Sequence, residues 1–229
     1  MIKRKARISK KKINSLLINF LHGSTAREAA RNTDINRNTA NSWYKHFREK
    51  IWEHCLQNKP RFSGEVEVDQ SQFGHWYMGR VQEATKVIGI LNRKTKEIYT
   101  CPIKDQTKET LWKVITEIVE PGSTIITDSW SSYNGIESMG YKHIKVNHSR
   151  EEWTDGKGNH TATVDAFFNT SDKRLGRYNG YRRYYFPLYL KECECLWNIA
   201  KLAEKVGSRQ SNKNFEARME MIKKIVGIN

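Results

Sequence analysis

The sequence predicts an α/β fold that follows a small all-α domain. The hydrophobic pattern changes from a period of about 3.6 residues to a period of about 2 near residue 60, as expected where helices give way to strands. The positive charge is concentrated before that point: residues 1–60 hold 14 Lys and Arg against 4 Asp and Glu, out of a net charge of +15. The expected domains are an all-α domain at 1–57, an α/β domain at 58–205 and a basic tail or helix at 206–229.

The all-α domain has the layout of a helix-turn-helix. Residues 13–21 have apolar side chains at helical spacing, and Gly23 follows as the expected C-cap. A short Ala-rich helix begins at Thr25, where Glu28 completes a capping box, and a turn leads to a longer basic helix from residue 37. This layout favours DNA binding, because the last helix can enter the major groove and reach base edges. The contact candidates on that helix are Arg37, Asn38, Asn41 and Lys45.

A three-helix bundle with solvated charges is the alternative for this domain. In either case the helix from residue 37 is expected to bury Trp43, Phe47 and Trp52. The basic arm at 3–12 would add phosphate contacts that weaken with salt, or would serve as a nuclear-import patch. The sequence does not separate these two roles of the arm.

The α/β domain has the element order of an RNase H-like fold. Its expected elements are strands at 64–73, 85–93 and 96–103, a helix at 108–119, strands at 123–128 and 141–147, and helices at 163–175 and from about residue 187. Three strands, a crossover helix and a further strand open an RNase H-like mixed sheet flanked by helices. In that order the first strand is central and the fourth strand pairs beside it.

Three acids occupy corresponding places on three of these elements. Asp69 ends the alternating pattern of the first strand, Asp128 ends the fourth strand, and Asp165 opens the next helix. Each acid alone has a structural interpretation, as a strand end, an N-cap and a first-turn acid favoured by the helix dipole, respectively. Together they offer the oxygen ligands that Mg²⁺ or Mn²⁺ prefers. The basic surplus indicates a polyanionic substrate, most simply DNA, and less often an anionic membrane.

The remaining composition indicates an intracellular chain. The four cysteines, at 55, 101, 193 and 195, form no C-x-x-C pair, which disfavours zinc and favours a reducing compartment. No apolar run reaches 18 residues, and the basic N-terminus does not have the pattern of a signal peptide. The expected location is the cytoplasm or nucleoid in a bacterium, or the nucleus in a eukaryote.

Aromatic and basic side chains near the acids have two possible roles. Trp130 and the run Tyr184 to Phe186 are expected in the core rather than as platforms for base stacking. Lys173 and Arg174 follow Asp165 on its helix and are candidates for contact with the DNA backbone, although a solvated face fits nearly as well.

Several sequence blocks resemble one known family, the Merlin-related insertion-sequence transposases of the DDE superfamily. The blocks are the helix-turn-helix, V-E-V-D-Q-S-Q-F-G, P-G-S-T-I-I-T-D-S-W-S-S-Y-N-G followed by V-N-H-S, G-N-H-T-A-T-V-D-A-F-F and Y-L-K-E-C. The resemblance spans nearly the whole chain. It implies an RNase H-like core with Asp69, Asp128 and Asp165 as the catalytic triad.

The resemblance also implies a reaction and its partners. The triad would hold two Mg²⁺ or Mn²⁺ ions; water would cut the element end, and the freed 3′-OH would then attack target DNA. The expected partner is double-stranded DNA, as terminal repeats and as target. Because two DNA ends must be paired, a homodimer or higher oligomer is expected.

The chain departs from the family pattern around the expected site. The third acid is usually Glu and here is Asp165, shorter by one methylene. Ala162 stands where Asn is common, Asp172 where Lys is usual, and Gln70 where Glu is frequent. The alternative is therefore a catalytically weakened or domesticated DNA-binding protein. A nuclease for another nucleic acid is a second alternative, which the helix-turn-helix argues against.

Overall fold

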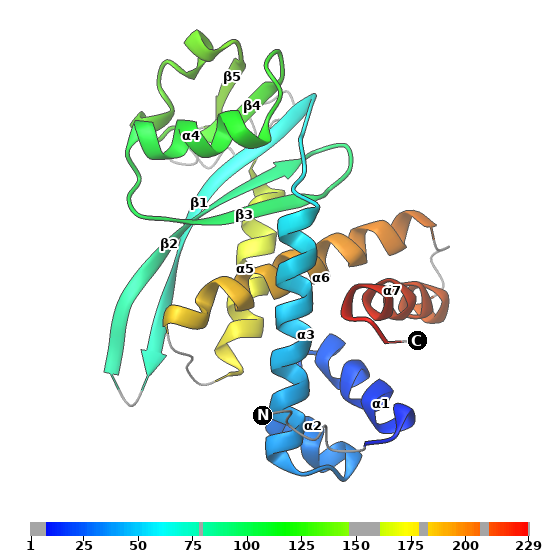
Figure 1. Cartoon of the computed structure of the whole chain (residues 1–229). Helices are drawn as coiled ribbons and strands as arrows, with labels where there is room; N and C mark the ends of the chain where they lie inside the picture. The colour runs from blue at the N-terminus through cyan, green and yellow to red at the C-terminus, as the bar shows by residue number, and fades with distance from the viewer. Residues whose placement is uncertain (1–7, 78–79, 147–160, 179–182, 207–210, 229) are drawn as a thin grey trace.

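The computed structural model describes residues 8–77, 80–146, 161–178, 183–206 and 211–228, without the side chains of residues 75–83, 206 and 211. A five-stranded mixed sheet forms one part of the molecule, and a helical bundle built from both ends of the chain forms the other (Figure 1). The N-terminal helices are α1 (Lys10–Leu21), α2 (Ala26–Thr33) and α3 (Arg37–Gln57). None of the described helices combines the length and hydrophobicity that crossing a membrane requires.

The helical bundle is closed by the C-terminal end of the chain. Its core contains Leu17 and Phe20 of α1, together with residues from α6 (Phe186–Val206) and α7 (Ser211–Val226). Leu196 and Ile222 are the buried representatives of those two helices. The segment expected at 206–229 as a tail or helix therefore contains a helix that packs against the N-terminal helices.

The buried face of α3 differs from the expected one. Phe47 is buried, but Trp43 and Trp52 are only half-buried. The buried positions of the helix are Ala40, Tyr44, Phe47, Arg48 and Ile51. Their spacing of three and four residues follows one side of an α-helix, which the set Trp43, Phe47 and Trp52 does not.

The sheet has the predicted RNase H-like order. Its strands are β1 (Glu65–Tyr77), β2 (Arg80–Asn92), β3 (Ile98–Ile103), β4 (Thr124–Asp128) and β5 (Lys142–Val146). They lie in the order β3-β2-β1-β4-β5, with β1, β2 and β3 antiparallel and β1, β4 and β5 parallel. The helix α4 (Lys108–Ile118) provides the crossover from β3 to β4. The predicted position of the first strand, in the centre beside the fourth, is confirmed.

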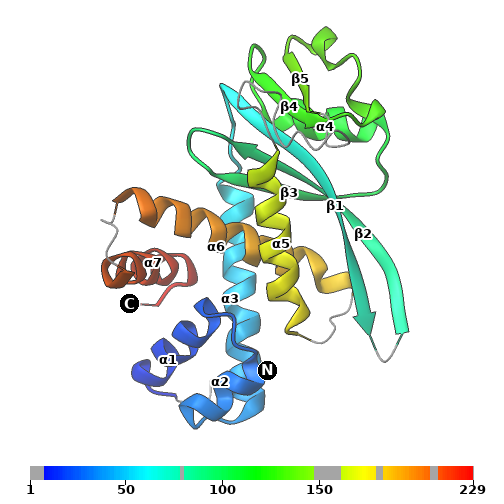
Figure 2. The same cartoon turned by 180° about the vertical axis from the view of Figure 1, so that it is seen from behind.

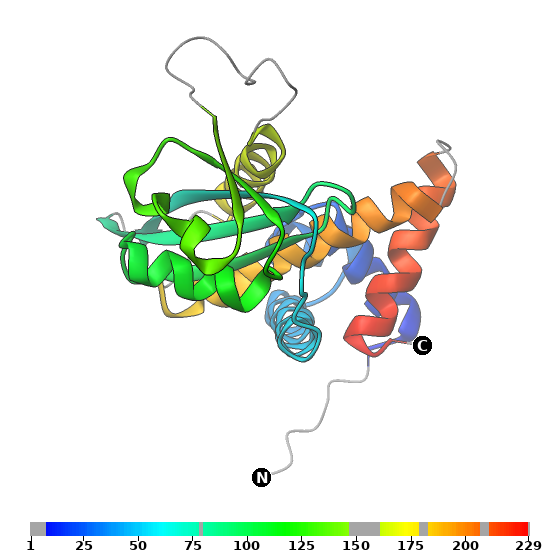
Figure 3. The same cartoon turned by 90° about the horizontal axis from the view of Figure 1, so that it is seen from above.

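Helices cover both faces of the sheet, as Figure 3 shows from above. On one face Val66 and Val68 pack against Leu111 and Ile115 of α4. The other face carries the odd-numbered side chains of β1 and is covered by α5 (Ala162–Gly176). Because side chains alternate along a strand, Asp69 belongs to the face under α5.

The helix α6 protects the exposed edge of β3. Asn198 accepts a hydrogen bond from the Ile98 N–H (2.8 Å) and donates one to the Ile98 carbonyl (2.9 Å). Glu194 accepts from the Thr100 N–H at 2.7 Å. An edge strand with open backbone groups is a template for aggregation, and these side chains occupy those groups. Cys193 and Cys195 of α6 are free, and they pack into different hydrophobic clusters.

Candidate active site and DNA-binding helix

Pairing of β1 with β4 places Asp69 and Asp128 side by side. In the parallel pair formed by β1 and β4, Glu67 lies opposite Ile126. Two residues further along both strands are Asp69 and Asp128, so the two carboxylates project from neighbouring strands on the same face of the sheet. Asp69 lies inside β1, which continues to Tyr77, whereas Asp128 is the last residue of β4.

The third acid arrives on α5, which lies close against the sheet (Figure 2). Asp165 is in the first turn of this helix. The approach is close because Gly89 on β2 pairs with Asp69 and has no side chain. A Cβ at Gly89 would lie 2.8 Å from Phe168 Cζ and 2.9 Å from Val164 Cγ2, both on α5. A glycine inside a strand often marks such a close approach.

The three carboxylates interact electrostatically. Burial is the largest cause that raises the pKa of Asp69, followed by a hydrogen bond from its side chain to that of Asp165. A hydrogen bond from the Gln70 backbone N–H lowers the pKa of Asp69, whereas the negative charges of Asp165 and Asp128 raise it further. The resulting pKa of Asp69 is about 8. The side chains of Asp69 and Asp165 therefore lie within hydrogen-bonding reach of each other. The shorter Asp at position 165 therefore still reaches Asp69.

The donor set fits a hard divalent cation. In the described part of the chain no group of three or more His, Cys, Asp or Glu side chains is already spaced around a single ion. Asp69 and Asp165 instead contact each other directly, with Asp128 near enough to act on the Asp69 pKa. Carboxylate oxygens are the ligands that Mg²⁺ and Mn²⁺ prefer, and a cation there would relieve the repulsion that raises this pKa.

A buried tyrosine lies beside the acids. Gln70 donates a hydrogen bond from Nε2 to the Tyr133 hydroxyl at 2.9 Å, and the Tyr133 side chain is fully buried. Burial raises the pKa of Tyr133 well above its usual value, and the charges of Asp69 and Asp128 raise it further. Gln70, which stands where the family often has Glu, therefore takes part in a neutral hydrogen bond next to the site.

Trp130 and the run Tyr184 to Phe186 were expected in the core. This expectation is wrong for Trp130, Tyr184 and Tyr185. The Trp130 residue is 49% exposed. Its backbone N–H donates a hydrogen bond to Asp128 Oδ1 at 3.1 Å. Trp130 follows the end of β4, beyond the sheet, and the nearby core position is taken by Tyr133. Tyr184 and Tyr185 are also exposed, and only Phe186 of that run is buried.

Three residues near the site were missing from the expectations. Glu67 and Gly89 lie under the first turns of α5, and Tyr133 contacts Gln70. Signals for two of them are present in the sequence. Glu67 shares the alternation of Asp69 and so faces the same side, and Gly89 interrupts a strand rich in β-branched residues. Nothing in the sequence distinguishes Tyr133 from other core aromatics.

The contact candidates on α3 are exposed together. Arg37, Asn38, Asn41 and Lys45 all lie on the surface at helical spacing. The first turn of α3 contains no acid, so its positive field is not locally neutralised. Lys45 makes a solvent-exposed ion pair with Glu49 (3.6 Å). Residues 3–7 of the basic arm lie outside the described part of the chain.

The structure contradicts the expectation that Arg174 contacts DNA. Its Nε donates to Glu192 Oε1 at 2.6 Å, and its Nη2 donates to the Phe20 carbonyl at 2.7 Å. These bonds turn the guanidinium into the bundle, because this side of α5 packs against α1 and α6. Lys173, the neighbouring candidate, remains exposed.

Comparison with known proteins identifies the family of the chain. Residues 61–198, more than half of the chain, match the family described as the ISXO2-like transposase domain. An uncharacterized transposase-like protein of Haemophilus influenzae is 30% identical over 115 residues, which cover 48% of this chain and 88% of that protein. The catalytic core domain of BIV integrase matches with a TM-score of 0.40 and 13% identity, over 70% of this chain and 96% of that chain. This last likeness is weak, and the fold is assigned from the strand order. The chain belongs to the ISXO2-like transposase family, whose process is DNA transposition.

Proposed function

We propose that the chain is a DNA transposase that cuts at the ends of its element and joins the freed 3′-OH to target DNA. Asp69, Asp128 and Asp165 are its catalytic acids in this proposal. The observation that carries it is the convergence of these three carboxylates from β1, β4 and α5, two of them in direct contact. Membership of the transposase family supports the process.

The chemistry assigned to the site is metal-dependent phosphoryl transfer. Two Mg²⁺ or Mn²⁺ ions held by the three acids would activate the attacking oxygen and stabilise the leaving one. The fold of the chain positions the three acids for this chemistry. Pairing of β1 with β4 places Asp69 beside Asp128, and α5 places Asp165 against Asp69. Asp69, whose pKa is raised, must lose its proton before it can act as a ligand, because metal ligands bind deprotonated.

DNA recognition is assigned to α3. Its exposed face can enter the major groove, where Arg and Asn side chains pair with guanine and adenine edges. The residues that carry this role are Arg37, Asn38, Asn41 and Lys45, with Lys173 as a backbone contact nearer the site. A homodimer or higher oligomer on DNA is part of the proposal, because strand transfer has to hold two ends together.

A cleavage assay tests the catalytic assignment. The substrate is duplex DNA from both sides of the chain's own coding sequence, incubated with Mn²⁺ and the purified protein. The parent is expected to cut, and Asp69→Ala and Asp128→Asn are expected to lose at least about 1000-fold in rate, since each removes a metal ligand. Glu109→Gln, an exposed acid on α4 across the sheet, is the control and should cut like the parent. Cutting by Asp69→Ala at the parent rate would overturn the assignment.

A repurposed DNA-binding protein is the second candidate. Ala162 and Asp172, on the helix that carries Asp165, depart from the family pattern and motivate it. The same experiment separates the two candidates. A parent protein that binds the DNA but leaves it uncut in Mn²⁺ would favour the repurposed protein.

A further inference from the structure

Glu67 is a buried carboxylate that the catalytic proposal does not use. It lies on β1 two residues before Asp69, on the same face of the sheet, and its side chain is fully buried. An ionised carboxylate is rarely buried unless charged or hydrogen-bonding groups surround it. The contacts of Glu67 therefore indicate why an acid occupies this position.

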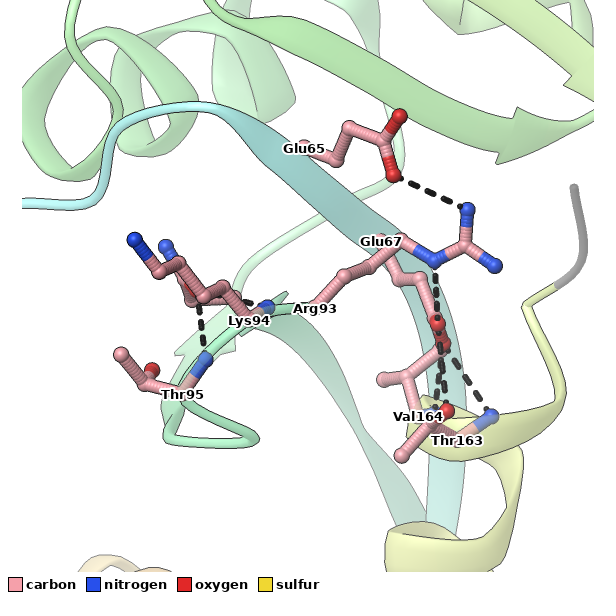
Figure 4. Close-up of polar contacts among 8 residues, drawn as sticks. Glu65, Glu67, Arg93, Lys94, Thr95, Thr163 and Val164 are labelled. Carbon is pink, nitrogen blue, oxygen red and sulfur yellow. Dashed lines mark hydrogen bonds and ion pairs between the residues drawn. The ribbon is translucent and has the colours of Figure 1, made fainter.

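Both oxygens of Glu67 are engaged by α5 and by one arginine (Figure 4). Oε2 accepts hydrogen bonds from the backbone N–H groups of Thr163 (3.1 Å) and Val164 (3.2 Å). Oε1 accepts one from the Thr163 hydroxyl (3.1 Å) and forms an ion pair with Arg93 Nε (3.3 Å). Among the described residues, these contacts occupy both oxygens of Glu67 and bind it to α5.

The contacts supply what the start of α5 lacks. The first N–H groups of a helix have no partner within the helix, and a capping side chain normally accepts from them. In α5 the N-cap residue, Thr161, makes no such side-chain bond. Glu67 accepts from two of these groups instead, from a different element. Its negative charge also lies at the positive end of the helix dipole.

Arg93 forms an ion pair with the Glu67 cap and with a second acid. Its guanidinium lies at the end of β2 and bridges Glu67 and Glu65, with Nη1 3.2 Å from Glu65 Oε2. One guanidinium thus contacts the carboxylates of both Glu65 and Glu67. A neutral residue at position 67 could not form the ion pair with Arg93.

We propose that Glu67 is a positioning residue that holds the first turn of α5 on β1 and so places Asp165 against Asp69. Asp165 directly follows Val164, and its own N–H makes an intrahelical bond to the Thr161 carbonyl (3.1 Å). The anchored residues and the acid are thus consecutive. The catalytic consequence rests on the proposed function, whereas the anchoring does not.

The decisive variant is Glu67→Gln, which keeps the shape and one acceptor oxygen but removes the charge. Amide hydrogen exchange of the metal-free protein is followed by NMR at Thr163 and Val164. Both amides are expected to exchange about tenfold faster or more than in the parent, because their bonds to a charged acceptor are weakened. Glu109→Gln, which changes an exposed carboxylate on α4 across the sheet, is the control and should leave these two amides unchanged.

Kinetics of DNA cleavage in Mn²⁺ add a second measurement. Glu67→Gln is expected to lower kcat about 100-fold with the KM for DNA unchanged, since a misplacement of about 1 Å costs that much. A Glu67→Gln chain that does not fold, or whose Thr163 and Val164 amides exchange as in the parent, would overturn the proposal. If the parent itself does not cut, the proposed function fails, and the exchange result still decides the role of Glu67.

Discussion

The two ends of α5 are each held by a buried glutamate, but in different ways. At the N-terminal end Glu67 accepts from backbone N–H groups of the helix and pairs with one arginine. At the C-terminal end, the contacts that Glu192 makes with described residues are with side chains. It accepts from Arg48 of α3, from Arg174 of α5 at 2.6 Å and from the Tyr178 hydroxyl at 2.7 Å. One end fixes a backbone position, and the other joins separate helices.

The charged groups around Glu192 stabilise the C-terminal end of α5 against the helical bundle. Burial by itself raises the pKa of Glu192, and the charges of Arg48 and Arg174 together with hydrogen bonds bring it below its usual value. The Arg48 guanidinium also lies over the Tyr189 ring, 4.2 Å from its centroid. The DNA-binding candidate α3 is thereby connected to the helix that carries Asp165. Glu67 therefore fixes the local position of the α5 backbone, whereas Glu192 links the helical bundle to the helix that carries Asp165.

Glu192→Gln is expected to have the largest effect on stability. Breaking a buried ion cluster from one side leaves Arg48 and Arg174 without their shared carboxylate and costs about 3–5 kcal/mol. Urea unfolding measures the loss. Glu204→Gln, an exposed ion-pair partner of Lys201 on the same helix, is the control and should change stability by less than about 1 kcal/mol. A loss at position 192 as small as that of the control would contradict the contrast between the two ends.

Gly89→Ala is expected to act on the N-terminal end alone. The added methyl group meets Phe168 and Val164 at less than 3 Å, so α5 must shift away from the sheet. The expected cost is about 1–3 kcal/mol of stability, with cleavage about 100-fold slower. Gly74→Ala, on β1 with nothing within 4 Å of the added atom, serves as the matched control. Equal behaviour of the two variants would show that the close approach is unimportant.

Asp69→Asn is expected to stabilise the metal-free protein at neutral pH. In the folded state the pKa of Asp69 is raised to about 8, mainly by burial and by Asp165. The favourable contribution of the protonated acid is present below pH ~4, near the unfolded pKa, and is lost as the pH rises through about 8. The gain for Asp69→Asn at pH 8 should be about 1–2 kcal/mol, allowing for partial screening, and should vanish near pH 4. Thermal unfolding in a chelator checks this, and a gain that is independent of pH would show that the titration of Asp69 is not its cause.

Lys45→Ala should have the smallest effect. Lys45 is exposed on α3 outside the Glu192 cluster, so stability should change by no more than about 0.5 kcal/mol. If it contacts a phosphate, the slope of log affinity against log salt should fall by about 0.9. Fluorescence anisotropy over a salt series measures the slope. Lys113→Ala, on α4, is the control, and an unchanged slope for Lys45→Ala would remove it from the DNA contacts.

The sequence was sufficient for the sheet and for the elements that carry the three acids. Alternation along β1 and the spacing of the apolar residues of α4 are local patterns, and they give the correct elements and strand order. Asp69 and Asp128 follow from these patterns because parallel strands bring equivalent positions level. The role of Asp165 was predicted from the resemblance of the surrounding sequence block to a known family, because no hydrophobic periodicity indicates which helix approaches the sheet.

Residues whose role depends on distant partners could not be predicted in the same way. Arg174 was expected on the DNA because its neighbours are basic, but Glu192 and the Phe20 carbonyl, distant in sequence, turn it inward. Glu67 has the pattern of a solvated strand acid, and only the packing of α5 over β1 buries it. In both cases a tertiary contact decides what a charged side chain does, and no local periodicity reports such contacts.

Manganese soaking of crystals tests the central claim, that the chain assembles Asp69, Asp128 and Asp165 into one metal-binding site. Anomalous diffraction locates Mn²⁺ independently of activity and of the DNA sequence recognised. We predict anomalous density between these three carboxylates in the parent, and its loss in Asp128→Asn crystals. Manganese bound only elsewhere, or density at the site that persists undiminished in Asp128→Asn, would contradict the claim.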